Sequence, residues 1–184
     1  MPNPARVVKV LATLLASMTI GAIVLMTMGH NPPPAGPFSL WSYYRLDPIK
    51  DMICSREEQS KDQWKWIEIY YSGTKSGNIE QLASLNGLSD SRDINCHFCI
   101  YNGFGGTDGQ IQPTEKWQKQ QPAPGPNKWY GSDQTIRICV VADGRAARPT
   151  DCQIKRIQAL VKQLIRNFDI KSESVFYPND SDWR

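Results

Sequence analysis

The chain has 184 residues, of which 40% are hydrophobic and 21% charged, so it is neither disordered nor fibrous as a whole. Its 21 basic and 18 acidic residues give a formal net charge of +3. This balance argues against a nucleic-acid-binding protein, which usually carries a basic face. Only two histidines are present, His30 and His97, so no site can use three histidine ligands. The length allows one domain and an appendage.

The first segment carries no charge from residue 10 to residue 28 (VLATLLASMTIGAIVLMTM). These nineteen residues are close to the ~20 that a helix needs to cross a bilayer. Arg6 and Lys9 precede the segment, and no acidic residue does, which predicts a cytoplasmic N-terminus. We therefore expect residues 1–28 to anchor the chain in a membrane, with the rest on the extracytoplasmic (periplasmic) side. A cleaved signal peptide and a buried core helix are the alternatives.

Export would place the cysteines in a compartment where disulfides form and persist. The sequence holds five: Cys54, Cys96, Cys99, Cys139 and Cys152. An odd number leaves at least one thiol free or bonded to another chain, and the pairing cannot be predicted from sequence.

Residues 29–63 are interpreted as a spacer and lead-in. Four prolines lie within residues 30–37 (HNPPPAGP), which predicts an extended, semi-rigid segment. The aromatic residues 39–44 (SLWSYY) would pack on the domain or lie at the membrane interface. The mixed, charged remainder suggests a short helix around residues 50–58.

The compact domain, residues 64–184, begins with alternating apolar and polar side chains. Residues 64–71 (WKWIEIYY) show this pattern, which is typical of a half-buried strand. Later patterns predict a short helix, a second strand, a glycine-rich hairpin and a central strand, at residues 78–85, 93–101, 102–111 and 135–142.

A long amphipathic helix follows Pro149. Thr150 can cap it, and Gln153 completes a capping box. Apolar residues then recur at helical spacing: Ile154, Ile157, Leu160, Val161, Leu164, Ile165 and Phe168. A last strand is expected at residues 174–177. Strands interleaved with helices indicate an α/β domain, with a central mixed sheet flanked by helices.

Several motifs occur in the order of a known family. They are WIEIYYSGT at 66–74, CHFCIYNG at 96–103, DGQI at 108–111, KW at 116–117, IRICVVAD at 136–143 and PTDCQ at 149–153. Together they resemble the zinc N-acetylmuramoyl-L-alanine amidases, the family that includes the peptidoglycan recognition proteins. The resemblance covers roughly residues 64–180.

The resemblance implies the amidase fold and cleavage between the lactyl group of N-acetylmuramic acid and the first L-alanine of the stem peptide. Family members hold one Zn²⁺ with two histidines and a third histidine or cysteine. The metal polarises the scissile carbonyl and lowers the pKa of its bound water to ~7. Commonly a tyrosine beside the metal assists.

This sequence departs from the family at every one of those positions. By the resemblance, Tyr70, Gly125 and Pro178 stand where the three ligands would be, and Cys96 replaces the assisting tyrosine. The sequence therefore predicts no zinc, no other cofactor and no catalytic residues.

A relocated metal would need the soft ligands of the predicted sheet: His97, Cys96, Cys99 and Cys139. Side chains alternate along a strand, so a Cys-x-x-Cys there should place its sulfurs on opposite faces. That arrangement argues against one shared ion and against a redox disulfide, whose motif normally starts a helix. We expect His97 to be partly buried and hydrogen-bonded instead.

A groove that remains after the loss of the metal could still bind a peptidoglycan fragment. Its expected residues are aromatic, apart from one arginine that could pair with a stem-peptide carboxylate: Tyr70, Tyr71, Trp117, Trp129, Tyr177 and Arg137. The alternative is that these aromatic side chains pack in the core or in loops.

Three functions stay open at this point. The first is a membrane-anchored, catalytically inactive amidase homologue that binds peptidoglycan, a muropeptide or a cell-wall partner. The second is an active amidase with atypical ligands, and the third is a purely structural or assembly protein.

Overall fold

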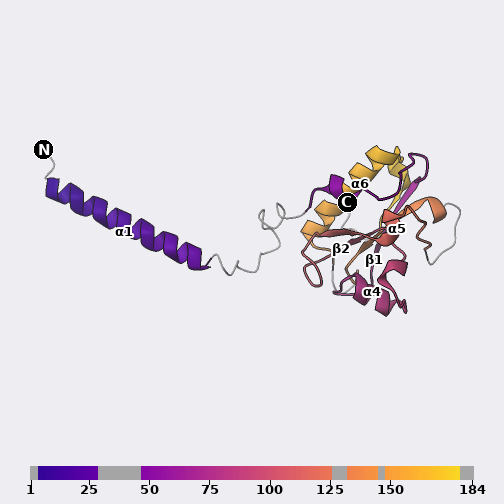
Figure 1. Cartoon of the computed structure of the whole chain (residues 1–184), viewed down its shortest axis with the longest axis horizontal. Helices are drawn as coiled ribbons and strands as arrows, with labels where there is room; N and C mark the ends of the chain where they lie inside the picture. Colours follow the sequence, from indigo (N-terminus) through magenta and orange to yellow (C-terminus); the bar gives the residue numbers. More distant parts are fainter. Residues whose placement is uncertain (1–3, 29–46, 126–131, 145–147, 179–184) are drawn as a thin grey trace. The chain divides into compact units, whose positions relative to one another are not determined.

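The computed structural model describes residues 4–28, 47–125, 132–144 and 148–178, and within the first range the side chains of residues 8–20. The chain divides into two compact units, Met1–Gly36 and Pro37–Arg184 (Figure 1). The prolines of residues 30–37 and the aromatic residues 39–44 lie outside the described residues. The domain boundaries predicted at residues 28 and 63 stay predictions.

Helix α1 (Pro4–Met28) forms the described part of the first unit. Among the residues described, no helix is both long enough and apolar enough to cross a membrane. The transmembrane helix that the sequence predicts is therefore not supported.

The second unit is built on one mixed sheet. Its strands are β1 (Trp66–Tyr71), β2 (Phe98–Ile100), β3 (Ile111–Pro113), β4 (Thr135–Val140) and β5 (Val175–Phe176). They lie in the order β3-β2-β4-β1-β5. All neighbouring pairs are parallel except β2 and β3, which form an antiparallel hairpin. The predicted α/β domain with a central mixed sheet is confirmed.

The strand expected at residues 93–101 is shorter than predicted. Asp90 accepts a hydrogen bond from the backbone N–H of Arg92 and caps the 3-10 helix η1 (Ser91–Asp93), so β2 begins only at Phe98. The helix expected around residues 50–58 is also shorter, because α3 comprises only Ile49–Met52. The remaining 3-10 turns, η2 (Ser132–Gln134) and η3 (Ser172–Ser174), lead directly into β4 and β5.

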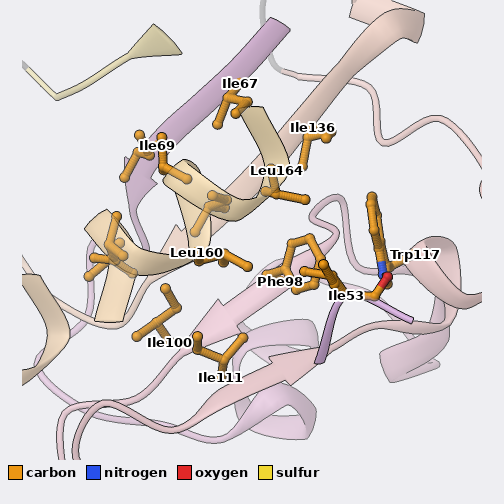
Figure 2. Close-up of a cluster of buried hydrophobic side chains, with 14 of the residues drawn as sticks. Ile53, Ile67, Ile69, Phe98, Ile100, Ile111, Trp117, Ile136, Leu160 and Leu164 are labelled. Atoms are coloured by element: carbon orange, nitrogen blue, oxygen red, sulfur yellow. The ribbon is translucent and has the colours of Figure 1, made fainter. Parts of the chain in front are cut away.

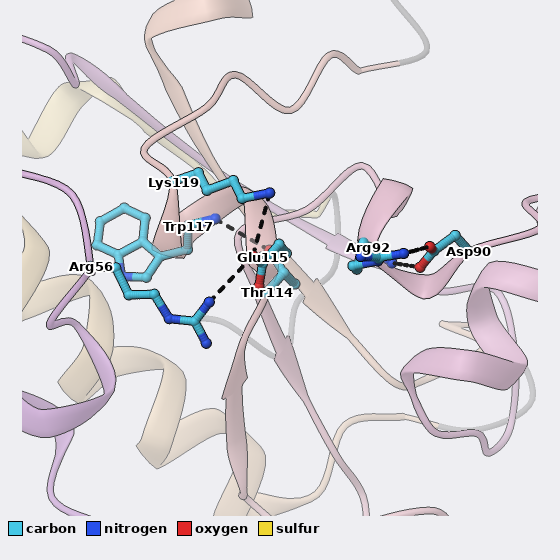
Figure 3. Close-up of polar contacts among 7 residues, drawn as sticks. All are labelled: Arg56, Asp90, Arg92, Thr114, Glu115, Trp117 and Lys119. Carbon is cyan, nitrogen blue, oxygen red and sulfur yellow. Dashed lines mark hydrogen bonds and ion pairs between the residues drawn. The ribbon is translucent and has the colours of Figure 1, made fainter.

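Helices cover both faces of the sheet. Helix α6 (Asp151–Phe168) lies on one side and α4 (Ile79–Leu85) on the other (Figure 1). Both begin with a complete capping box, in α6 the predicted pair Thr150 and Gln153. The short α5 (Glu115–Gln118) is capped by Thr114 (Figure 3).

Two cations surround the first residue of α5. The carboxylate of Glu115 lies 3.4 Å from the side-chain nitrogens of both Arg56 and Lys119 (Figure 3). Because both cations are largely exposed, each pair should contribute only ~0–1 kcal/mol. Backbone N–H groups of Arg56 and Glu57 also bond the carbonyl of Gln118 and fix the lead-in against α5.

The larger apolar cluster lies between the sheet and α6 (Figure 2). Trp117 is fully buried there, with its ring centroid 4.6 Å from that of Phe98 and 6.0 Å from that of Phe168. Its indole N–H donates to the carbonyl oxygen of Ile53 at 3.1 Å. The lead-in residue Ile53 is therefore part of the core.

One polar side chain joins α6 to the sheet inside this apolar layer. Gln153 is completely buried, and its Nε2 donates to the carbonyl oxygens of Ile100 at 3.0 Å and Val141 at 3.2 Å. Its Oε1 accepts the backbone N–H of Thr150. The capping residue therefore also hydrogen-bonds the backbone at the carboxyl ends of the neighbouring strands β2 and β4.

We expect Gln153→Leu to lower the free energy of unfolding by about 1–3 kcal/mol, because it leaves buried polar groups without their partner. Urea denaturation measures this. Gln158→Leu makes the same change at an exposed position of the same helix and should alter stability by less than about 0.5 kcal/mol. Equal effects from the two variants would contradict the assigned role of Gln153.

Candidate binding cavity

A cavity of about 380 Å³ opens at the carboxyl ends of β1 and β4, on the α4 side of the sheet. Five segments wall it: the end of β1, strand β4, α4 with the turn after it, and the segments 94–95 and 124–125. The lining residues are Tyr70, Tyr71, Ser72, Leu82, Asn86, Leu88, Ile94, Asn95, Pro124, Gly125, Arg137 and Cys139. The lining therefore combines apolar contacts with a few polar groups.

Arg137 supplies the positive charge of the cavity although it is only 4% exposed. Its Nε donates to Oε2 of Glu68 at 2.7 Å, and its Nη1 donates to the carbonyl oxygens of Asn95 at 2.8 Å and Pro124 at 3.2 Å. The guanidinium carbon lies 4.4 Å from the centroid of the Tyr70 ring, a cation–π contact. These partners offset the cost of burying the charge.

His97 connects Arg137 to the segment that follows α5. Its Nδ1 accepts the backbone N–H of Arg137 at 2.9 Å. Its Nε2 therefore carries the proton, which it donates to the carbonyl of Gln121 at 3.0 Å. Complete burial lowers the pKa of His97 to about 4. The prediction of a hydrogen-bonded histidine is confirmed, with more complete burial than expected, and both ring nitrogens are occupied.

The neutral His97 should make stability depend on pH. The unfolded chain takes up a proton near pH 6.5, whereas the folded chain does so only near pH 4. Between these values the unfolded state binds more protons, so the free energy of unfolding falls as pH is lowered, by roughly 3 kcal/mol in total. Urea titrations from pH 7 to pH 4 should show this loss, and His97→Gln should remove most of it.

His30→Gln serves as the control, because it removes the other histidine of the sequence. If His30→Gln flattened the pH dependence and His97→Gln did not, the assignment to His97 would be wrong.

One thiol lines the cavity and two lie beneath it. Cys96, Cys99 and Cys139 are all buried and belong to one apolar cluster on the α4 side. The prediction that Cys96 and Cys99 point to opposite faces is wrong. Cys96 precedes the first residue of β2, so the alternation that holds within a strand does not separate the two side chains.

The three thiols differ in acidity. Hydrogen bonds from the thiols of Cys96 and Cys99 hold the pKa of Cys139 well below its usual range despite burial. Hydrogen bonding to Cys139, together with burial, raises the pKa values of Cys96 and Cys99. The protonation states of the three thiols are therefore tied to one another.

The structure brings together part of the predicted site. Tyr70, Tyr71, Arg137 and Gly125 line the cavity, and Cys96 lies below it. Trp117 does not line it, because it is enclosed in the core on the α6 side.

Two further predicted positions also lie elsewhere. Tyr177 is 41% exposed and, like Pro178, is not among the lining residues. Trp129 lies outside the described residues.

Sequence reasoning missed the part of the lining that comes from turns. Asn95 is the clearest case, since its carbonyl accepts hydrogen bonds from both Arg137 and the Tyr70 hydroxyl. Because the acceptor is a backbone carbonyl, the type of side chain at this position does not indicate its role. Leu82 belongs to a helix whose pattern was visible, but nothing in that pattern indicates what the helix faces.

The residues present do not fit the zinc that the resemblance implies. Burial raises the pKa of Tyr70 well above its usual value, so its oxygen stays a protonated phenol that donates to Asn95 at 3.3 Å. Gly125 and Pro178 have no side-chain donor atom for a metal. Among the described residues, no group of three His, Cys, Asp or Glu side chains could hold a metal ion.

No protein-family model matches the sequence, and no curated protein does. Solved structures do match. The structure of a point mutant of PlyL has a TM-score of 0.46 and 14% identity, covering 62% of this chain and 68% of that one.

Two further matches come from E. coli and from Alvinella pompejana. The E. coli amidase AmiD, in complex with anhydro-N-acetylmuramic acid-L-Ala-D-gamma-Glu-L-Lys, has a TM-score of 0.43 and 19% identity over 65% of this chain and 50% of that one. PGRP-Hd from Alvinella pompejana has a TM-score of 0.42 and 12% identity over 72% and 85%. The chain is thus structurally similar to amidases and to a peptidoglycan recognition protein, but with TM-scores below 0.5 and identities below 20% this similarity carries no conclusion about its function.

Proposed function

We propose that this domain binds a peptidoglycan fragment in the cavity and does not hydrolyse it. The observation that carries the proposal is the cavity itself, about 380 Å³ at the carboxyl ends of parallel strands, with two tyrosines and an arginine in its walls. Its volume lies in the range of small-molecule sites, and such strand ends are where open α/β sheets bind ligands.

The lining suits a muropeptide in two ways. Tyr70 and Tyr71 offer aromatic surface for the apolar faces of sugars. Arg137 lines the cavity and offers a guanidinium donor to a carbonyl or carboxylate of the stem peptide. Because Glu68 already neutralises the guanidinium, we expect Arg137 to contribute directional hydrogen bonding more than net charge.

The absence of hydrolysis is inferred from the residues at the family's chemical positions. Tyr70, Gly125 and Pro178 cannot assemble the donor set of a zinc amidase. Cys96 is buried beneath the cavity, where it contacts Cys139 rather than the open space. An active amidase with atypical ligands is the first alternative, and a purely structural or assembly protein is the second.

The proposal includes an extracytoplasmic location, because peptidoglycan lies outside the cytoplasmic membrane. The uncharged residues 10–28, with Arg6 and Lys9 before them, support export.

Binding can be tested by narrowing the cavity. Leu88 lines it, so Leu88→Trp should fill part of it and weaken retention on sacculi and affinity for a purified muropeptide by at least about tenfold. Leu85→Trp makes the same change at a side chain that is 69% exposed and outside the lining, and should bind as the original chain does. Equal loss in both variants, or no retention of the original chain, would argue for a structural role.

Hydrolysis is tested separately, on the full chain with and without added Zn²⁺. We expect substoichiometric zinc by elemental analysis and no release of stem peptide from muropeptide, because the donor set is incomplete. One bound zinc per chain together with stem-peptide release would establish the active-amidase alternative.

A further inference from the structure

A molecule in the cavity can reach the three thiols only in a fixed order. Cys96 and Cys99 are completely buried, whereas Cys139 is 4% exposed and forms part of the cavity lining. A small molecule in the cavity therefore reaches the sulfur of Cys139 first. The other two thiols lie behind it, within the same apolar cluster.

The backbone brings Cys139 close to both neighbours. Cys99 and Cys139 are register partners on the adjacent parallel strands β2 and β4. Strands in a sheet are ~4.8 Å apart, which falls within the Cα separation of ~4.4–6.8 Å that disulfides require. The thiol of Cys96 hydrogen-bonds Cys139 as well, so Cys139 has two candidate partners.

The groups around Cys139 favour its thiolate. The thiols of Cys96 and Cys99 donate to its sulfur, and the Tyr70 hydroxyl and the guanidinium of Arg137 lie nearby. Thiolates are the nucleophiles in exchange with disulfides, and nearby donors and cations increase their population.

We propose that Cys139, Cys96 and Cys99 form a thiol–disulfide exchange site that reacts through the cavity with a low-molecular-weight disulfide. This inference goes beyond the proposed function and does not depend on what else the cavity binds. It requires no metal, only an oxidant of that class.

The exchange takes two steps. The Cys139 thiolate attacks one sulfur of the disulfide RSSR, whose S–S bond breaks, giving a mixed disulfide and one thiolate that takes up a proton to become RSH. Cys96 or Cys99 then loses its proton and attacks the sulfur of Cys139, which releases the second RSH. The protein loses two electrons and two protons, RSSR gains both, and one internal disulfide results.

The test uses the full chain and bis(2-hydroxyethyl) disulfide, a small neutral oxidant. After incubation, free thiols are alkylated and the protein is digested with trypsin without reduction. Cys96 and Cys99 fall in peptide 93–116, Cys139 in peptide 138–145, and Cys54 and Cys152 in two others. We expect peptide 93–116 to be joined to peptide 138–145. A Cys54→Ser/Cys152→Ser variant should give the same link.

Two variants separate the steps. Cys96→Ser/Cys99→Ser should stop at a mixed disulfide on Cys139, and Cys139→Ser should leave peptide 93–116 fully alkylated. A disulfide within peptide 93–116 of the original chain would overturn the proposal. So would free Cys139 under conditions that fully modify the exposed Cys54. The map of the original chain decides the question even if a variant fails to fold.

Discussion

Burial of a guanidinium in the central strand is the constraint on which the cavity depends. Strand β4 is paired on both sides and buried along its whole length, yet it carries Arg137. An unpaired charge there would be prohibitively costly, so polar groups must converge on it. Glu68 comes from β1, and the carbonyl oxygens of Asn95 and Pro124 come from two loops. Strand β1 and the segments around Asn95 and Pro124, which satisfy the arginine, also form part of the cavity wall.

His97 extends the hydrogen-bond network of Arg137 away from the cavity and towards the aromatic core. By accepting the N–H of Arg137 and donating to the carbonyl of Gln121, it ties the start of β2 to β4 and to the chain beyond α5. Its ring also packs against Trp64, with centroids 4.8 Å apart. The uncharged imidazole of His97 therefore contacts both the polar wall of the cavity and the aromatic part of the core.

Much of the fold could be predicted because it follows from local periodicity. The alternation in β1, the apolar run of β4 and the capping box of α6 each depend on neighbouring residues. The site was less predictable, since its walls come from segments that only the tertiary fold brings together. Trp117 was misplaced because α5, with four residues, is too short to show an apolar periodicity that would indicate which face it packs on. Cys96 was misplaced because the strand begins two residues after it.

The two faces of the sheet are occupied very differently. The α6 side holds the extensive apolar cluster that includes Trp64, Phe98 and Leu164, whereas the α4 side holds a smaller one in which three cysteines and two tyrosines lie among aliphatic side chains. We therefore expect substitutions to be tolerated better on the α4 side of the sheet than on the α6 side. Changes at the cavity face can alter chemistry while the opposite layer preserves the architecture.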